Sequence, residues 1–120
     1  MLIVDDSKFM RSFIRAQSER LCFETEQAAN GLEALSKLAA SPPFDIVLID
    51  WDMPVMDGME LLEKMRGDPE FDAVKILMVT ARTGPAEVIE AMSKGADEYL
   101  MKPITSEMIT EKLRIIGLIE

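Results

Sequence analysis

The chain has 120 residues, of which 48% are hydrophobic and 29% are charged, a composition typical of one globular domain rather than of a disordered segment. Its formal net charge of −9, without a long basic run, argues against direct binding to nucleic acid or anionic lipid, because both depend on neutralising phosphates. No apolar stretch approaches the ~20 residues of a membrane span and the N-terminus lacks the layout of a signal peptide, so we expect a cytoplasmic protein without membrane insertion.

Short apolar runs alternate with amphipathic stretches along the chain, in the order strand then helix. The predicted strands are Leu2–Asp5, Glu24–Ala28, Asp45–Asp50, Lys75–Thr80 and Glu98–Met101. This alternation predicts a single α/β domain over residues 1–120, in which helices cover both faces of a parallel sheet.

Capping signals indicate where five helices begin. The residues that carry these signals are Ser7 for the first helix, Asn30 with Glu33 for the second, Asp57 with Glu60 for the third, Pro85 for the fourth and Thr105 for the fifth. The pairs Asn30 with Glu33 and Asp57 with Glu60 predict capping boxes, and Gly95 is expected to end the fourth helix.

Apolar residues at helical spacing support all five helices and predict the inner faces of the second and third. They are Phe9, Met10, Phe13, Ile14 and Leu21 in the first helix, Leu32, Leu35 and Leu38 in the second, Leu61, Leu62 and Met65 in the third, Val88, Ile89 and Met92 in the fourth, and Met108, Ile109, Leu113 and Ile116 in the fifth.

The polarity of the predicted strands indicates their places in the sheet. The run Glu24–Ala28 is polar and belongs at an edge, whereas the run that ends at Asp50 is apolar enough to be central. These places fit a doubly wound, five-stranded parallel sheet in the order 2-1-3-4-5. Ligands of such sheets bind outside the carboxyl ends of the strands, where the order reverses.

Side chains with compatible chemistry fall on that edge of the predicted sheet. They are Asp5, Asp6, Asp50, Thr80 and Lys102. Neighbouring carboxylates repel one another unless a cation lies among them, and Mg²⁺ prefers hard oxygen ligands in octahedral geometry. We predict Asp6 and Asp50 as Mg²⁺ ligands, with Asp5 assisting directly or through water. The backbone carbonyl of Asp52 is a further candidate oxygen.

An acid at the end of a buried strand, such as Asp50, is a candidate nucleophile. Lys102 would supply a compact positive charge opposite the metal, and the Thr80 hydroxyl would donate to a phosphoryl oxygen. Phosphoryl transfer requires mainly positioning and charge neutralisation, so this set is sufficient. An aspartate after a strand is most often only a turn former or a helix cap. Compatible chemistry at four of the five strand ends favours a site over that simpler reading.

Two residue counts limit the chemistry further. The chain has no histidine, which excludes Ser-His-Asp and Cys-His nucleophile systems, histidine-ligated zinc and histidine phosphorylation within the chain. Any phosphohistidine in its chemistry therefore belongs to another protein. The single cysteine, Cys22, cannot form an internal disulfide, and its apolar neighbours Leu21 and Phe23 predict a packed core thiol.

Several motifs in this chain share their order and spacing with a known signature. They are Asp5-Asp6, Asp50 followed by Met53-Pro54 and Asp57-Gly58, Thr80-Ala81, Tyr99 and Lys102-Pro103. Together they span nearly all of the chain, which resembles a two-component response-regulator receiver domain of the CheY-like chemotaxis type. This family exemplifies the flavodoxin-like, CheY-like fold with the strand order given above, so the resemblance and the fold prediction are not independent.

The resemblance implies that Asp50 accepts a phosphoryl group from the phosphohistidine of a partner histidine kinase, with Mg²⁺ bound by Asp5, Asp6 and Asp50. It also implies that Thr80 shifts toward the phosphoryl group and that Tyr99 turns inward. The surface of the fourth helix, the fifth strand and the fifth helix would then change its affinity for a downstream protein. On that surface we expect Ile89, Glu90, Lys94 and Tyr99.

Two positions that vary within the family are Asp52, two residues after the acceptor, and Arg82, two after the threonine. We expect them on either side of the path of a water that attacks the aspartyl phosphate. Their opposite charges would let them pair and screen the phosphoryl group, although Asp52 could instead orient the water and speed hydrolysis. The Lys102-Pro103 bond resembles the family's cis peptide, and Glu90 with Lys94 has the spacing of a solvated helix pair.

Parts of the sequence also resemble other kinds of protein. Asp50-Trp51-Asp52 resembles the nucleophile motif of haloacid-dehalogenase-type phosphatases, but the Asp pair comes first here and last in that family. An FMN binder is disfavoured because Asp5-Asp6 replaces the hydroxyl- and glycine-rich phosphate loop that it needs. A receiver-like module that is never phosphorylated conflicts with the complete residue set, and a receiver domain from a longer multidomain response regulator stays open.

Overall fold

The computed structural model describes residues 1–40 and 43–120. Its strands are β1 (Leu2–Val4), β2 (Glu26–Ala28), β3 (Ile46–Ile49), β4 (Lys75–Thr80) and β5 (Glu98–Met101). Its helices are α1 (Lys8–Arg20), α2 (Gly31–Ala40), α3 (Gly58–Arg66), α4 (Pro85–Ser93) and α5 (Ser106–Ile116), with a short 3-10 helix η1 at Pro69–Phe71. The predicted α/β alternation is confirmed, although the first three strands are one or two residues shorter than predicted.

Within the described residues, the strands form one parallel sheet in the order β2-β1-β3-β4-β5. This is the predicted order, with the polar β2 at an edge and the fully buried β3 in the centre. In the register of the ladder, Ile49 lies opposite Val4 on one side and Met78 on the other. The carboxyl ends of β1, β3 and β4 therefore meet at one edge of the sheet.

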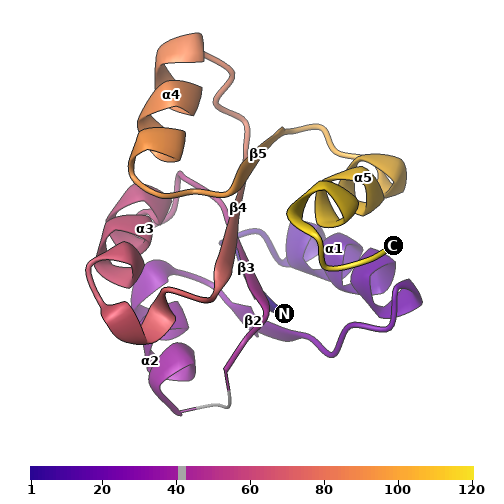
Figure 1. Ribbon diagram of the computed structural model, residues 1–120, viewed down its shortest axis with the longest axis horizontal. Coiled ribbons are helices and arrows are strands. Elements are labelled where there is room, and N and C mark those ends of the chain that lie inside the picture. The colour runs from indigo at the N-terminus through magenta and orange to yellow at the C-terminus, as the bar shows by residue number, and fades with distance from the viewer. Residues whose placement is uncertain (41–42) are drawn as a thin grey trace.

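Helices cover the sheet in two layers, with α1 and α5 on one face and α2, α3 and α4 on the other (Figure 1). Because successive side chains of a strand point to opposite faces, Ile46 and Leu48 of β3 join the core under α1 and α5. Val47 and Ile49 of β3 join the core under the other three helices. Both cores consist mainly of buried aliphatic and methionine side chains, which pack closely on the two faces of the sheet.

Some apolar residues at helical spacing lie at the surface. Leu32, predicted for the inner face of the second helix, is 55% exposed, and Phe9 is 78% exposed, because helical spacing finds the apolar stripe of a helix but not how much of it the neighbouring elements cover. Ile89, which is expected on the output surface, is 68% exposed. Cys22 is exposed at a left-handed turn after α1, with φ of 68°, so the prediction of a core thiol was wrong.

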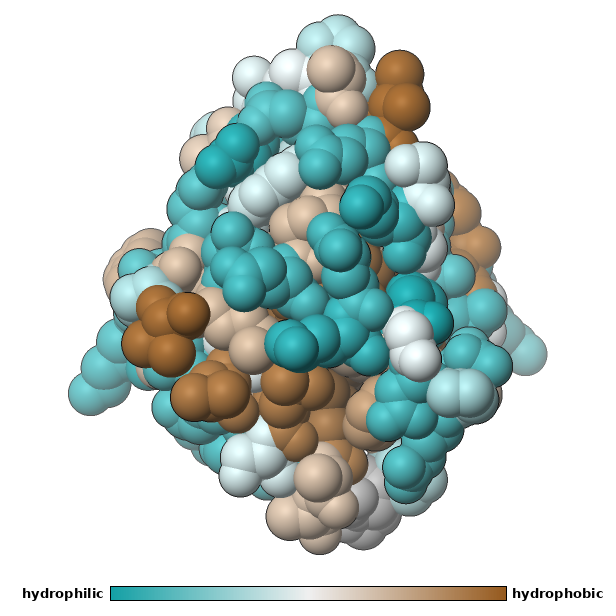
Figure 2. Space-filling view, turned by 90° about the vertical axis from the view of Figure 1, so that its left-hand side faces the viewer, coloured by the Kyte–Doolittle hydropathy of each residue, from teal (hydrophilic) through white to brown (hydrophobic). Residues whose placement is uncertain are grey.

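The face of α2, α3 and α4 is mostly hydrophilic, and its apolar side chains gather in the lower half (Figure 2).

Side-chain caps form at the starts of α1, α2, α3 and α5, as the sequence predicts, but among the described contacts the capping boxes predicted for α2 and α3 lack the reverse bond. Ser7 accepts a hydrogen bond from the backbone N–H of Met10, and Asp57 accepts one from Glu60. In the described contacts, the reverse bond of a capping box is made at α4, where Oε1 of Glu87 accepts from Gly84 N at 3.3 Å. None of the described helices has the length and apolarity needed to cross a membrane.

Candidate functional site

Three aspartates lie together at the carboxyl edge of the sheet. Asp5 follows β1, Asp50 follows β3, and Asp6 lies beside them, with one carboxylate oxygen of each within 4.8 Å of the others. Asp5 and Asp50 are 2% and 7% exposed, whereas Asp6 is open to solvent. The bond from Asp50 N to the carbonyl of Val4, at 2.9 Å, continues the β-ladder and fixes this position. The parallel register thus brings together carboxylates that are far apart in sequence.

Lys102 enters the same cluster from the loop after β5. Its Nζ donates to Oδ2 of Asp5 at 2.8 Å and to Oδ2 of Asp50 at 3.4 Å. Its own backbone N–H donates to the carbonyl of Thr80 at 2.9 Å, and the peptide bond to Pro103 is cis, as the resemblance implied. The ammonium group therefore lies against the two buried carboxylates.

Burial and neighbouring charges shift the pKa values of Asp50 and Lys102. Burial raises the pKa of Asp50, and the nearby charge of Asp5 raises it further, against the lowering effect of Lys102. Burial would lower the pKa of Lys102, but the hydrogen bond to Asp5 and the charge of Asp50 outweigh it and raise that pKa. With all groups ionised, the three carboxylates and one ammonium leave two negative charges, so the oxygens suit a divalent cation.

The loop after β3 packs tightly against the backbone of Asp50. Gly58, the first residue of α3, donates from its backbone N–H to the carbonyl of Trp51 at 2.8 Å. A Cβ at Gly58 would lie 2.1 Å from the carbonyl oxygen of Asp50. Only glycine fits this approach, which accounts for the Asp57-Gly58 motif and holds the Asp50 backbone against the start of α3.

Thr80 and Tyr99 both contact the backbone of Arg82. The buried Oγ1 of Thr80 accepts from Arg82 N at 3.3 Å, and the hydroxyl of Tyr99 donates to Arg82 O at 2.9 Å. Tyr99 is 7% exposed, so its ring is already turned inward in this structure. Burial and the charge of Glu87 raise the pKa of the Tyr99 hydroxyl. The loop after β4 is thus bound to both proposed switch residues.

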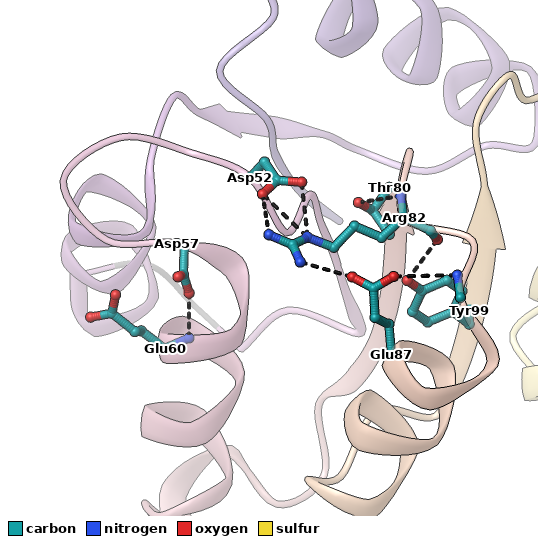
Figure 3. A network of polar contacts seen from close by, with 8 residues as sticks. Asp52, Asp57, Glu60, Thr80, Arg82, Glu87 and Tyr99 are labelled. Atoms are coloured by element: carbon teal, nitrogen blue, oxygen red, sulfur yellow. Dashed lines mark hydrogen bonds and ion pairs between the residues drawn. The ribbon is translucent and has the colours of Figure 1, made fainter.

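The side chain of Arg82 lies between two acidic groups (Figure 3). Its Nη2 contacts Oδ1 of Asp52 at 2.6 Å, its Nε donates to both Asp52 oxygens, and its Nη1 donates to Oε2 of Glu87 at 2.8 Å. The guanidinium also stacks over the Trp51 ring, 4.7 Å from its centroid. The hydrogen bonds to Asp52 and then Glu87 raise the pKa of Arg82, so the group stays charged. The expected pair of Asp52 and Arg82 is present.

Two partners of Arg82 could not be found by the sequence reasoning. Glu87 occupies the third position of α4, where the visible signal is that of a helix cap after Gly84 and Pro85. Trp51 is visible as the neighbour of Asp50, but its stacking on Arg82 joins two separate loops. The Asp52 carboxylate faces Arg82, and a metal contact from the Asp52 carbonyl stays a prediction.

Comparison with known proteins places this fold and site in a family. Residues 1–114 match the model of the response regulator receiver domain. The chain is 39% identical over 117 residues to the chemotaxis protein CheY1 of Helicobacter pylori, covering 97% of this chain and 94% of that protein. It is 38% identical over 114 residues to a chemotaxis protein CheY homolog of Campylobacter jejuni, covering 94% and 88% of the two chains.

A solved structure gives the same result. The chemotaxis response regulator CheY4 of Vibrio cholerae superposes with a TM-score of 0.89 at 34% identity, covering 96% of this chain and 95% of that one. The chain belongs to the response regulator receiver domain family. Receiver domains are phosphorylation-activated switches of two-component signalling, and this chain is such a switch. The phosphatase and FMN-binding alternatives are not favoured.

Proposed function

We propose that Asp50 is the phosphoacceptor of this receiver and that its phosphorylation alters a protein-binding surface in a chemotaxis-like pathway. The observation that carries the proposal is the position of Asp50, a buried carboxylate between Asp5 and Lys102 at the carboxyl edge of the sheet. The chemotaxis proteins named above support the kind of pathway. Membership of the receiver family supports a histidine kinase as the donor, and its phosphohistidine must lie on that partner because this chain has no histidine.

The proposed reaction needs few parts. One Asp50 carboxylate oxygen attacks the phosphorus of the phosphohistidine, a P–O bond forms, and the P–N bond to the leaving imidazole breaks. The loss of the phosphoryl group reverses this state, because water attacks phosphorus and releases phosphate while the Asp50 carboxylate re-forms. We propose that Lys102 compensates the charge of the phosphoryl oxygens and that Thr80 donates its hydroxyl to one of them.

We further propose that Mg²⁺ is held by Asp5, Asp6 and Asp50, with the carbonyl of Asp52 as an additional oxygen. Their clustered oxygens and the net negative charge of the group support this assignment. When bound, Mg²⁺ would neutralise charge on the transferred phosphoryl oxygens. In the structure, the ammonium of Lys102 contacts Asp5 at 2.8 Å, so it already lies beside the proposed metal ligands.

The lifetime of the phosphorylated form is proposed to depend on Asp52 and Arg82. Their hydrogen-bonded pair lies next to Trp51, the neighbour of the acceptor, so it can limit the approach of water to the phosphoryl group. Asp52 is 58% exposed at its side chain, which makes the pair a surface contact with a modest effect.

The output surface is proposed on α4, β5 and α5. Exposed apolar side chains on these elements support the proposal, at Ile89, Met92, Met101 and Ile115. Tyr99 is buried and acts there only through the loop that it holds. Lys94 pairs with Glu63 of α3 at 3.5 Å, so the expected partnership of Lys94 with Glu90 is replaced by a contact between helices.

The direct test is labelling with acetyl phosphate in the presence of Mg²⁺. The wild-type protein should gain one acid-labile phosphate, and Asp50→Asn should gain none because the amide is a far weaker nucleophile. Glu70→Asp, at an exposed position on η1, serves as the control and should be labelled like the wild type. Labelling of Asp50→Asn at the wild-type rate would remove Asp50 from the role of acceptor.

A further inference from the structure

Arg82 contacts more parts of this domain than its proposed role in limiting water access requires. That role places it, paired with Asp52, at the opening of the site beside Asp50, which we call the site mouth. Its backbone N–H and carbonyl are bound to Thr80 and Tyr99, and its side chain is shared between Asp52 and Glu87. Figure 3 shows the guanidinium between the two acids, with Asp52 on the loop after β3 and Glu87 on the first turn of α4. A single residue thus joins the acceptor loop, the switch residues and a helix.

The two acids that bind Arg82 belong to different kinds of backbone structure. Asp52 lies on an irregular loop and its side chain is 58% exposed, whereas the side chain of Glu87 is 32% exposed and belongs to a helix. Glu87 is itself fixed, because its Oε1 accepts from Gly84 N while its Oε2 accepts from Arg82 Nη1 at 2.8 Å. Asp52 therefore makes more bonds to the guanidinium, but Glu87 is the one of the two acids that is anchored to a helix.

The Nε and Nη2 edge of the planar guanidinium binds Asp52 and its Nη1 binds Glu87, so holding both acids at once restricts its orientation. That orientation also places it over the Trp51 ring. If Glu87 lost its charge, Asp52 and the ring would remain as partners, and both lie on the same loop. Arg82 could then follow the movements of that loop instead of closing the mouth of the site.

We propose that Glu87 is a positioning residue for phosphate loss: it holds Arg82 across the site mouth and, by the same contact, couples that mouth to the first turn of α4. This inference rests on the proposed function of Asp50 and of the Asp52 and Arg82 pair. Glu87 does not touch the reacting atoms. The same guanidinium that limits water access is thereby tied to the helix that begins the proposed output surface.

The matched variants are Glu87→Gln and Glu70→Gln. Glu87→Gln retains an oxygen that accepts from Gly84 N but loses the charge that binds Arg82, so it separates positioning from helix capping. Glu70→Gln removes the same charge from an exposed residue of η1. After labelling with acetyl phosphate and removal of the donor, Glu87→Gln should lose phosphate about two- to five-fold faster than wild type, the range expected for a surface ion pair. Glu70→Gln should match the wild type.

Two further measurements separate positioning from a general structural effect. In an Arg82→Ala background, Glu87→Gln should add no further acceleration, because the residue through which it acts is gone. Arg82→Lys, whose ammonium cannot span both acids in the same way, should behave like Glu87→Gln. The emission of Trp51, the only tryptophan, should differ from wild type in Glu87→Gln without any phosphorylation, and Glu70→Gln should leave it unchanged.

The outcomes distinguish this inference from the function on which it rests. Wild-type phosphate lifetime and Trp51 emission in Glu87→Gln would overturn the positioning role, as would an equal acceleration by Glu87→Gln with and without Arg82. Failure of the wild-type protein to accept any phosphate would instead overturn the proposed role of Asp50. In that case an unchanged Trp51 emission in Glu87→Gln would also refute the contact, and a changed emission would support it.

Discussion

Two arginines, Arg66 and Arg82, lie at opposite ends of the sheet and are bound in contrasting ways. Arg66, at the end of α3, donates to the carbonyls of Gly95, Phe71 and Val74 at 2.8 to 3.0 Å. Its remaining bond, at 3.0 Å, goes to Oδ2 of Asp97, which also accepts from Ile76 N at 2.8 Å. Arg82 binds the side chains of two acids, and its own side chain is 39% exposed against 19% for Arg66.

The two arginines differ in how freely the groups that accept their hydrogen bonds can move. The backbone carbonyls of η1, of the turn before β4 and of the loop before β5 cannot move without moving the chain, so Arg66 fastens these segments to one another. The carboxylates around Arg82 are on rotatable side chains, and other anions can compete for the same donors. Gly95 permits the close approach of the Arg66 side chain, because a Cβ there would lie 2.6 Å from Cγ of Arg66, and its φ is 113°. Arg66 therefore stabilises the fold, whereas Arg82 suits an adjustable contact.

The largest effect is expected for Arg66→Ala. This change removes four hydrogen bonds and leaves three backbone carbonyls and Asp97 with fewer partners, which should lower the free energy of unfolding by about 2 to 4 kcal/mol. Urea denaturation measures this value, and Arg66→Lys should recover only part of it. A loss below about 0.5 kcal/mol, the range of ordinary surface substitutions, would contradict the structural role.

A smaller effect on stability, but a direct effect on the site, is expected for Arg82→Ala. The unfolding free energy should fall by less than about 1 kcal/mol, because the ion pairs are partly exposed. Phosphate loss should be about five-fold faster at most, since each ~1.4 kcal/mol of barrier is a factor of ten in rate. Slower loss in Asp52→Ala with an unchanged rate in Arg82→Ala would show instead that Asp52 orients the attacking water.

The smallest effect is expected from salt. Exposed ion pairs are screened when the Debye length falls from about 10 Å at 0.1 M to about 3 Å at 1 M, so high salt should weaken the hold on Arg82. Phosphate loss from the wild-type protein should quicken by roughly two-fold between these concentrations, while Arg82→Ala changes less. The difference in unfolding free energy between the wild type and Arg66→Ala should persist at both salt concentrations. If salt changed the rate of phosphate loss equally in the wild type and in Arg82→Ala, the contrast between an adjustable Arg82 and a fixed Arg66 would be contradicted.

The sequence alone determined the architecture and the edge on which the site lies. The alternation of strand and helix signals, the polar second strand and the apolar third are local properties, and they agree with the order that the structure has, which the family resemblance also implies. Placing Asp5, Asp50 and Lys102 together followed from the same rules, because the carboxyl ends of parallel strands share one edge. Helix caps such as Ser7 could likewise be found from residues three positions apart.

Only the tertiary structure decided which side chains meet between elements. The partner of Lys94 is Glu63 on another helix, Arg82 reaches Glu87 as well as Asp52, and Cys22 lies outside the core. Sequence periodicity gives the apolar face of a helix but not its rotation against its neighbours or the rotamers at its margins. Contacts of long charged side chains depend on both, because a few degrees of rotation changes which partner lies within hydrogen-bonding distance.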